Sequence, residues 1–346
     1  MDPFDINQHG VATPSNQTSH NDSHCEGFIY NPNLAPALFF LMFPIALLLN
    51  GVAAWVFLHL KSTSTFIVYL KNLVAADIII AVIVPIQAAS DLSGASNVQF
   101  ALSCRYFSVI FYSTMYTCIA LLGLISLDRF FKIMMPQSKV FANLTFSKVV
   151  SASIWVILFG SSALPNIILS NQSTANMTEI GSCMKLKGPA GLETHERTVI
   201  YLNVLFWLVS VVIVVCYICI TNKVIQSFRN SGSNNSQGKQ KIKLRVFLVV
   251  IVFFVSFGPY HIVRIPYTFQ QVNYSSKTSC AYLLGKFAKE ISLWFATTNI
   301  CMNPLLYVFL CREFMEELKS MMKRLSAPFR AASAGKAGRA LPQTRL

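Results

Sequence analysis

Seven long apolar segments constrain the fold of this chain more than any other feature. A membrane-spanning helix needs about 20 mostly apolar residues. Every segment is long enough, and together they cover residues 34–60, 65–89, 103–135, 146–169, 198–225, 246–269 and 283–310. The connections are short, so consecutive helices are expected to run antiparallel in one bundle. The sequence therefore predicts an all-α membrane protein with a seven-transmembrane helix bundle at 34–310.

The composition excludes several other classes of protein. Only 12% of the 346 residues are charged, whereas a soluble domain carries about 25%. With 27 Phe and 12 Tyr, the chain is also too apolar for disorder. The net charge of +14 would suit nucleic acid, but the basic residues form no face of a polar domain, so no nucleic acid partner is expected. We find no recognisable nucleophile motif and expect no enzyme.

Charge and glycosylation patterns predict the orientation of the bundle. Residues 1–33 are polar and contain no Lys or Arg, and an extracellular N-terminus places most of the 28 Lys and Arg on the cytoplasmic side. We therefore predict a multi-pass plasma-membrane protein with an extracellular tail at 1–33 and a cytoplasmic C-terminus. Sequons on the expected outer side provide five candidate glycosylation sites, at Asn16, Asn21, Asn171, Asn176 and Asn273.

The residues after the seventh segment predict a short eighth helix. Apolar residues recur at helical spacing in 311–325, as is typical of an amphipathic helix that lies on membrane lipids. Cys311 at its start is a candidate for palmitoylation, although a plain apolar cysteine fits equally well. Residues 326–346 are small and basic, so we expect a disordered cytoplasmic tail. Residues 344–346 match a PDZ-binding peptide, a pattern short enough to occur by chance.

Ionisable residues inside a membrane span are costly and need an explanation. Asp77 lies in the middle of the second segment, and Asn50, Asn299 and Asn303 lie at comparable depth in other segments. Together they could form a hydrated cluster that holds a sodium ion, or a hydrogen-bonded network without an ion.

Asp128 and Arg129 end the third segment at its cytoplasmic side. We expect these neighbours to form a local ion pair that holds the arginine until a partner competes for it. Pro259 and Pro304 interrupt the sixth and seventh segments and allow these helices to bend.

The outer ends of the sixth and seventh segments predict a site for an anion with a flat ring. Arginine offers a rigid fork of donors that suits phosphate or carboxylate. The sixth segment places Arg264 on one face with three other residues, beside His261, and the seventh segment begins with two lysines and a glutamate. These residues are Tyr260, Tyr267 and Gln271, and Lys286, Lys289 and Glu290. The alternative is an internal Arg264–Glu290 salt bridge with lysines that reach to water.

Four of the nine cysteines are expected on the outer side, where the environment is oxidising. They are Cys25, Cys104, Cys183 and Cys280, and they allow three pairings, among which the sequence does not choose.

The chain resembles rhodopsin-like G-protein-coupled receptors from about residue 34 to 325. The matching motifs are Asn50-Gly51, LVAAD at 73–77, Cys104, Asp128-Arg129-Phe130, Trp155 and Asn303-Pro304-x-x-Tyr307. The resemblance implies a Cys104–Cys183 disulfide, which leaves Cys25 to pair with Cys280. It also implies roles in activation and G-protein coupling for Asp128, Arg129, Asn303, Pro304 and Tyr307.

A narrower resemblance is to the purinergic nucleotide receptors that respond to ADP or UDP-sugars, and most of all to those that respond to ADP. It rests on FIVYLKN at 66–72, VIFYSTMY at 109–116, LPNIILSN at 164–171, KLKGPAGL at 185–192, PYHIVRIPYT at 259–268 and FAKEISLW at 287–294. It implies an inhibitory G protein that lowers cyclic AMP. It also implies nucleotide contacts from Tyr112, Asn166, His195, His261, Arg264, Tyr267, Gln271 and Lys289.

At some positions, the residue differs from the one that is usual in the families that the chain resembles. Val199 stands where the nucleotide branch usually has Asn, which puts one polar ligand contact in doubt. Asn303 follows the wider family, and not the Asp of the branch. Cys118 replaces a hydroxyl that often helps to hold sodium. Phe111 replaces the aspartate of amine receptors and Thr297 the retinal-bearing lysine of opsins, which excludes both classes.

The predicted function is therefore a cell-surface receptor for extracellular ADP. Three alternatives stay open at the level of sequence. The first is a receptor for UDP-sugars, the second is a receptor of the same fold for a lysophospholipid or lipid carboxylate, and the third is a membrane transporter. The halves of the chain show no obvious internal similarity of the kind that many transporters carry.

Overall fold

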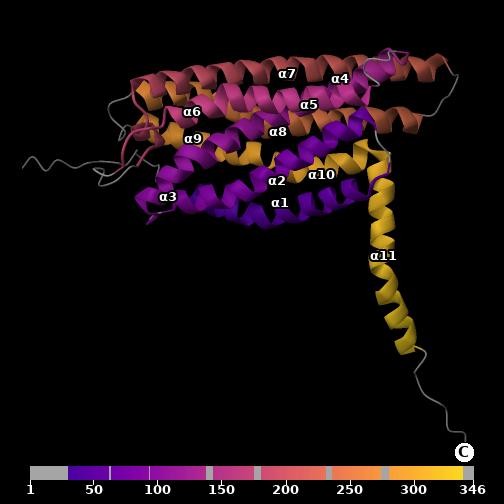
Figure 1. Cartoon of the computed structure of the whole chain (residues 1–346). Helices are drawn as coiled ribbons and strands as arrows, with labels where there is room; N and C mark the ends of the chain where they lie inside the picture. Colours follow the sequence, from indigo (N-terminus) through magenta and orange to yellow (C-terminus); the bar gives the residue numbers. More distant parts are fainter. Residues whose placement is uncertain are drawn as a thin grey trace, which may run out of the picture.

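The computed structural model describes residues 30–61, 64–92, 94–137, 143–174, 181–230, 236–273 and 280–337. Helices are the only regular secondary structure among the described residues, and seven helical stretches are long and apolar enough to cross a membrane. They lie side by side in one elongated bundle (Figure 1). The predicted fold class is therefore confirmed. The stretches are Leu34–His59, Thr65–Asp91, Asn97–Met134, Leu144–Ile168, Pro189–Ser227, Leu248–Val272 and Cys280–Leu310.

Four of these stretches are single helices, and three are interrupted. The single helices are α1 (Leu34–His59), α2 (Thr65–Asp91), α7 (Pro189–Asn230) and α8 (Ser236–Asn273). The third stretch joins α3 (Asn97–Leu102), the π-helix η1 (Ser103–Phe107) and α4 (Ser108–Met134). The fourth joins α5 (Leu144–Leu158), the π-helix η2 (Phe159–Ala163) and α6 (Leu164–Ile168). The seventh joins α9 (Cys280–Thr297) and α10 (Asn299–Leu310).

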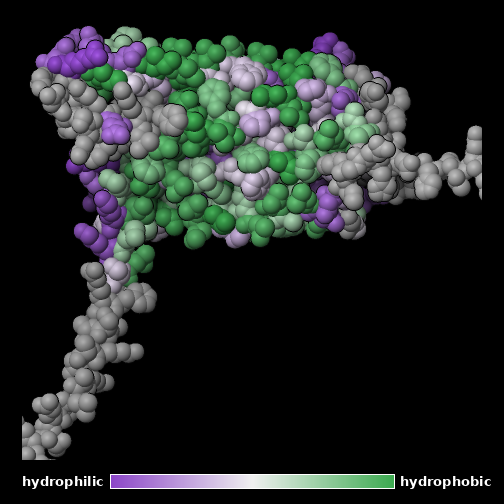
Figure 2. All heavy atoms as spheres, turned by 180° about the vertical axis from the view of Figure 1, so that it is seen from behind, coloured by the Kyte–Doolittle hydropathy of each residue, from purple (hydrophilic) through white to green (hydrophobic). Residues whose placement is uncertain are grey.

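The surface of the bundle is built to face lipid. Large apolar side chains such as Leu58 and Val156 are exposed along the flanks of the helices. Figure 2 shows this apolar surface over the middle of the bundle, with hydrophilic residues gathered toward its ends. Apolar side chains on the outside cost nothing in hydrocarbon, whereas they would be unfavourable in water. The interior is packed by residues such as Leu73, Ile119 and Phe206, which are fully buried.

An eighth helix follows the bundle, and it is longer than predicted. Helix α11 (Arg312–Ala337) extends past residue 325, where the sequence pattern suggested that the helix ends. Residues 326–337 contain five alanines, and alanine has the highest helix propensity. The helix leaves the end of the bundle at a steep angle to α10 (Figure 1). Phe314 anchors it, because its ring packs against Phe57 and Tyr307 with centroids 4.9 and 5.8 Å away.

Cys311 links α10 to α11 and is buried. Burial raises the pKa of its thiol to about 11, which suppresses the reactive thiolate. Palmitoylation of Cys311 stays a prediction, and it would require this side chain to turn outward.

Candidate ligand-binding site

A cavity of about 190 Å³ opens at the end of the bundle where α1 begins. We call it the main cavity. Six of the eight predicted contact residues line it: Tyr112, Asn166, His195, Arg264, Gln271 and Lys289. Tyr267 instead lines a second cavity of about 350 Å³, which shares Gln271 and Lys289 with the first. The structure therefore brings most of the predicted site together from α4, α6, α7, α8 and α9.

Arg264 is the central charged group of the main cavity. Its side chain is only 5% exposed, and no carboxylate of the described residues lies within 4.0 Å of it. Its guanidinium lies 5.4 Å from the centre of the Tyr112 ring and 3.5 Å from His195 Nε2. A buried cation without a counter-charge is strongly unfavourable, so this site is suited to an anion from outside the chain.

The alternative Arg264–Glu290 salt bridge is not formed. The Tyr30 hydroxyl donates its one proton to the Glu290 carboxylate, with its oxygen 3.0 and 2.9 Å from the two carboxylate oxygens. The carboxylate also lies 4.0 Å from Lys286 Nζ. The pKa of Tyr30 is raised, first by burial and then by the charge of Glu290. The Tyr30 hydroxyl therefore stays protonated and keeps Glu290 engaged away from Arg264.

Lys187 is a cation of the main cavity that sequence reasoning missed. Its Nζ donates to Asn166 Oδ1 at 2.8 Å, and burial lowers its pKa to about 8. The Cys104–Cys183 disulfide ties the short helix η3 (Cys183–Leu186), which immediately precedes Lys187, to η1. The sequence did indicate that Lys187 lies near the cavity, because it follows the disulfide-bonded Cys183 by four residues. Whether its side chain points into the cavity depends on the fold of this loop, which the sequence pattern does not give.

His261 does not line either cavity. Its ring stacks on Phe206 with centroids 3.7 Å apart, and its Nδ1 lies 2.8 Å from the carbonyl of Phe257. The backbone carbonyl of His261 accepts from Asn203. The residue therefore packs α8 against α7, because its ring is stacked on Phe206 and does not enter the cavity that Arg264 lines.

The disulfide between Cys104 and Cys183 confirms the implied pairing. Cys280 is also disulfide-bonded, but Cys25 lies outside the described residues. The same is true of Asn16, Asn21, Asn176 and residues 344–346. Asn171 is exposed, as a glycosylation site requires, and only the backbone of Asn273 is described. Glycosylation and the PDZ interaction stay predictions.

The buried Asp77 lies in a polar cluster between α2 and α10. It accepts two hydrogen bonds of 3.0 Å from Asn303 and one of 3.2 Å from Tyr307. A cavity of about 10 Å³ beside Asp77 is also lined by Asn299, whose Oδ1 has no hydrogen-bond partner among the described residues. A carboxylate and a free amide oxygen fit a hard cation. Asp77 and Asn299 are thus the residues that would hold the predicted sodium ion, whose binding stays a prediction.

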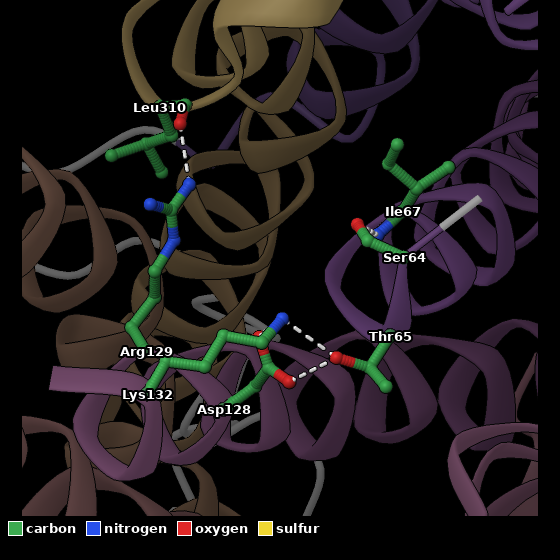
Figure 3. Close-up of polar contacts among 7 residues, drawn as sticks. All are labelled: Ser64, Thr65, Ile67, Asp128, Arg129, Lys132 and Leu310. Carbon is green, nitrogen blue, oxygen red and sulfur yellow. Dashed lines mark hydrogen bonds and ion pairs between the residues drawn. The ribbon is translucent and has the colours of Figure 1, made fainter. Parts of the chain in front are cut away.

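At the opposite end of the bundle, Asp128 and Arg129 do not form the predicted ion pair. Asp128 accepts a 2.6 Å hydrogen bond from Thr65 and lies 2.8 Å from Lys132 Nζ. Arg129 donates to the carbonyl of Leu310, and its guanidinium stacks 3.8 Å above the Phe66 ring. Figure 3 shows the two side chains pointing to different partners. Thr65 and Lys132 bind the Asp128 carboxylate, so Arg129 has other partners.

Among the described residues, seven helical stretches could span a membrane, a disulfide ties the loop after the fourth stretch to the third, and Asp128 and Arg129 stand next to each other at the end of the third. This combination is typical of a seven-transmembrane receptor. The family model described as "7 transmembrane receptor (rhodopsin family)" matches residues 49–307. The chain therefore belongs to the rhodopsin-like G-protein-coupled receptors.

Individual relatives narrow the family further. The chain is 45% identical to purinoceptor 13 of Homo sapiens over 291 residues, which are 84% of this chain and 81% of that receptor. It is 37% identical to purinoceptor 14 of Bos taurus over 287 residues, 82% of this chain and 84% of that receptor. It is also 37% identical to G-protein coupled receptor 87 of Mus musculus over 321 residues, 91% of this chain and 86% of that one.

Within the rhodopsin-like receptors, the chain is thus a member of the purinergic family. It is a multi-pass plasma-membrane receptor with a nucleotide ligand and a G-protein partner, and not an enzyme. The transporter alternative is wrong, because the family consists of receptors.

Proposed function

We propose that this chain is a cell-surface receptor that extracellular ADP activates, and that it acts through an inhibitory G protein to lower cyclic AMP. The main cavity then faces the outside of the cell and α11 the cytoplasm. The observation that carries the proposal is the buried Arg264, which has no carboxylate partner among the described residues and lies against the Tyr112 ring.

The charges around Arg264 favour a diphosphate over a single carboxylate. Lys187 and Lys289 line the same cavity, and Asp91 is the one carboxylate among the described lining residues. Three cations against one anion suit a ligand with several negative charges. Each pair at 4 Å contributes about 4 kcal/mol at an effective dielectric constant near 20, before the cost of desolvation. The Tyr112 ring provides a flat surface for the rest of the ligand.

Ligand binding can change the structure at the G-protein end of the bundle, because the helices that carry the cations extend toward that end. Arg264 lies on α8 and Lys289 on α9, so one diphosphate would draw the outer ends of these helices together. A ligand shifts a conformational equilibrium only when it binds one packing better than the other. Pro259 lies inside α8 and Pro304 inside α10. Proline allows a helix to bend there, so closure outside would become opening inside. Arg129 is already free of Asp128 and would meet the G protein there.

The test is a ligand panel on cells that express the receptor, with cyclic AMP as the readout. The panel contains ADP, ATP, UDP-glucose and a lysophospholipid series. We expect ADP to lower cyclic AMP in wild-type cells and to lose its effect in Arg264→Ala and Lys289→Ala, at equal surface expression. A response to UDP-glucose or to lysophospholipids alone would assign the receptor to the corresponding alternative. A response to ADP that both variants retain would contradict the site.

A further inference from the structure

The main cavity and the second cavity meet beside a carboxylate. Of the polar and charged residues that line them, Asp91, Gln271 and Lys289 border both cavities, whereas Arg264 and Lys187 border only the main cavity. Asp91 is the last residue of α2, and Lys289 lies on α9. We call the place that Asp91, Gln271 and Lys289 share the junction. A ligand that extends from the main cavity into the second cavity would pass Asp91.

Beyond the junction, the cations lose their majority. Among the described residues, the second cavity is lined by two lysines and two carboxylates, namely Lys286, Lys289, Asp91 and Glu290. Lys286 Nζ is already engaged, since it lies 4.0 Å from the Glu290 carboxylate and 4.9 Å from the centre of the Tyr30 ring. When a diphosphate pairs with Lys289, two carboxylates therefore remain in the second cavity against Lys286 alone.

The end of α2 adds negative charge to the junction. The last carbonyl groups of a helix carry a partial negative charge. Helix α2 has no basic residue in its last turn, and its end lies at the second cavity, which Ser90, Asp91 and Leu92 line. No lysine or arginine of the described residues lies within 4.0 Å of the Asp91 carboxylate. An approaching anion therefore meets a carboxylate and a helix C-terminus that no close ion pair neutralises.

The proposed binding mode directs a longer phosphate chain toward the junction. A nucleotide carries its base and its last phosphate at opposite ends. With the base against Tyr112 and the diphosphate between Arg264 and Lys289, a third phosphate would extend past Lys289, which already borders the second cavity. There it would meet Asp91. A triphosphate that moves back to avoid this carboxylate would lose the contact of its base with Tyr112.

We propose that Asp91 makes the receptor select a nucleoside diphosphate over a nucleoside triphosphate. The proposal rests on the proposed function, which places the diphosphate at Arg264 and Lys289. The cations of the main cavity attract both kinds of nucleotide, so attraction alone would favour the triphosphate, which carries more charge. Asp91 and the end of α2 repel the third phosphate most strongly, because it comes nearest to them. Repulsion of the wrong ligand is a common source of specificity.

The test is competition for labelled ADP on membranes that carry the full-length receptor. The competitors are ADP and a hydrolysis-resistant analogue of ATP, so that cleavage to ADP does not contribute. Asp91 is exposed to the water of the cavities, and solvent screens its charge. Wild-type receptor should therefore bind ADP about tenfold more tightly than the triphosphate, and not by a larger factor. Equal affinity of the two nucleotides would overturn the proposal and leave the proposed function intact, whereas a receptor that binds no labelled ADP would overturn both.

Asp91→Gln and Asp91→Glu isolate the effect of the charge, because glutamine and glutamate have nearly the same shape. Asp91→Gln should bind the triphosphate about tenfold more tightly than Asp91→Glu does, whereas their affinities for ADP should differ by only about twofold. Asparagine is avoided at this position, because it would complete a glycosylation sequon with Leu92 and Ser93. Asp91→Ser is a second neutral variant, and it should lose the preference for ADP as Asp91→Gln does.

Glu193→Gln is the control for the loss of a carboxylate elsewhere on the receptor. Glu193 is exposed on α7, is paired with Arg197 at 2.6 Å, and lines neither cavity. This variant should keep the wild-type preference for ADP. A preference in Asp91→Gln and Asp91→Ser equal to that in Glu193→Gln, with all three variants at the cell surface, would overturn the proposal.

Discussion

Arg129 donates to the carbonyl of Leu310, although the carboxylate of Asp128 is its neighbour in sequence. The bond joins the end of α4 to the last residue of α10, which only Cys311 separates from α11. Arg129 is available for the bond to Leu310 because Thr65 and Lys132 bind the Asp128 carboxylate. The residue expected to meet the G protein is thus positioned by partners on α2 and α10.

Replacing Thr65 by Val should weaken coupling. Both Thr65 and Asp128 are buried, and a hydrogen bond to a charged group contributes about 1.5 kcal/mol. Asp128 would lose this partner and compete for Arg129. We expect about tenfold less potent ADP signalling in a cyclic AMP assay, with unchanged nucleotide binding in the absence of G protein. Signalling as potent as wild type would show that Thr65 does not control Arg129.

The pKa of Lys187 predicts a pH dependence of nucleotide affinity. Burial lowers this pKa to about 8, so the ammonium is present below that pH and is lost above it. An anionic ligand favours the charged form and raises the pKa in the complex. Affinity should therefore be constant below about pH 8 and should fall by up to about tenfold per pH unit above it. The phosphates do not interfere, since their last ionisation lies near pH 6.

Lys187→Arg is the control for this effect, because arginine stays charged throughout the range. Binding of labelled ADP to membranes between about pH 6.5 and 9.5 should decline for wild type and remain flat for the variant. Parallel curves for the two proteins would assign the pH dependence to another group.

The disulfide should control affinity through Lys187. Cys183 pairs with Cys104 across 79 residues of sequence and lies four residues before Lys187. Loss of a native disulfide typically costs about 2–5 kcal/mol of stability and frees the loop that it closes. Cys183→Ala should therefore lower both the melting temperature and the affinity for ADP. Cys219→Ala, which removes a free cysteine of α7, should change neither by a comparable amount.

The sequence predicted the seven spans because their signal is local. Runs of apolar residues identify a spanning helix without knowledge of its neighbours, as for Leu34–His59. The Arg264 face of α8 was also predictable, since helical spacing alone brings Tyr260, Arg264 and Gln271 together.

What failed were predictions that depend on the choice between partners. Asp128 was expected to hold Arg129 because they are adjacent, but Thr65 from another helix competes better. His261 was grouped with Arg264, although its ring stacks on Phe206 of α7. Lys187 was missed because only the folded loop turns it inward. The Asp128–Lys132 contact was predictable, because these residues lie four apart on α4. The other contacts join distant segments, which helical periodicity does not contain.

The most direct test of the central claim is equilibrium binding of labelled ADP to wild-type receptor, Arg264→Ala and Arg197→Ala in membranes. Arg197 is a matched control, since it is an exposed arginine of α7 that is paired with Glu193. Loss of a buried charge partner for phosphate costs about 3 kcal/mol or more, so Arg264→Ala should bind ADP at least about a hundredfold more weakly. Arg197→Ala should bind it as wild type does. Equal affinity of all three proteins for ADP would contradict the assignment of the main cavity as the nucleotide site.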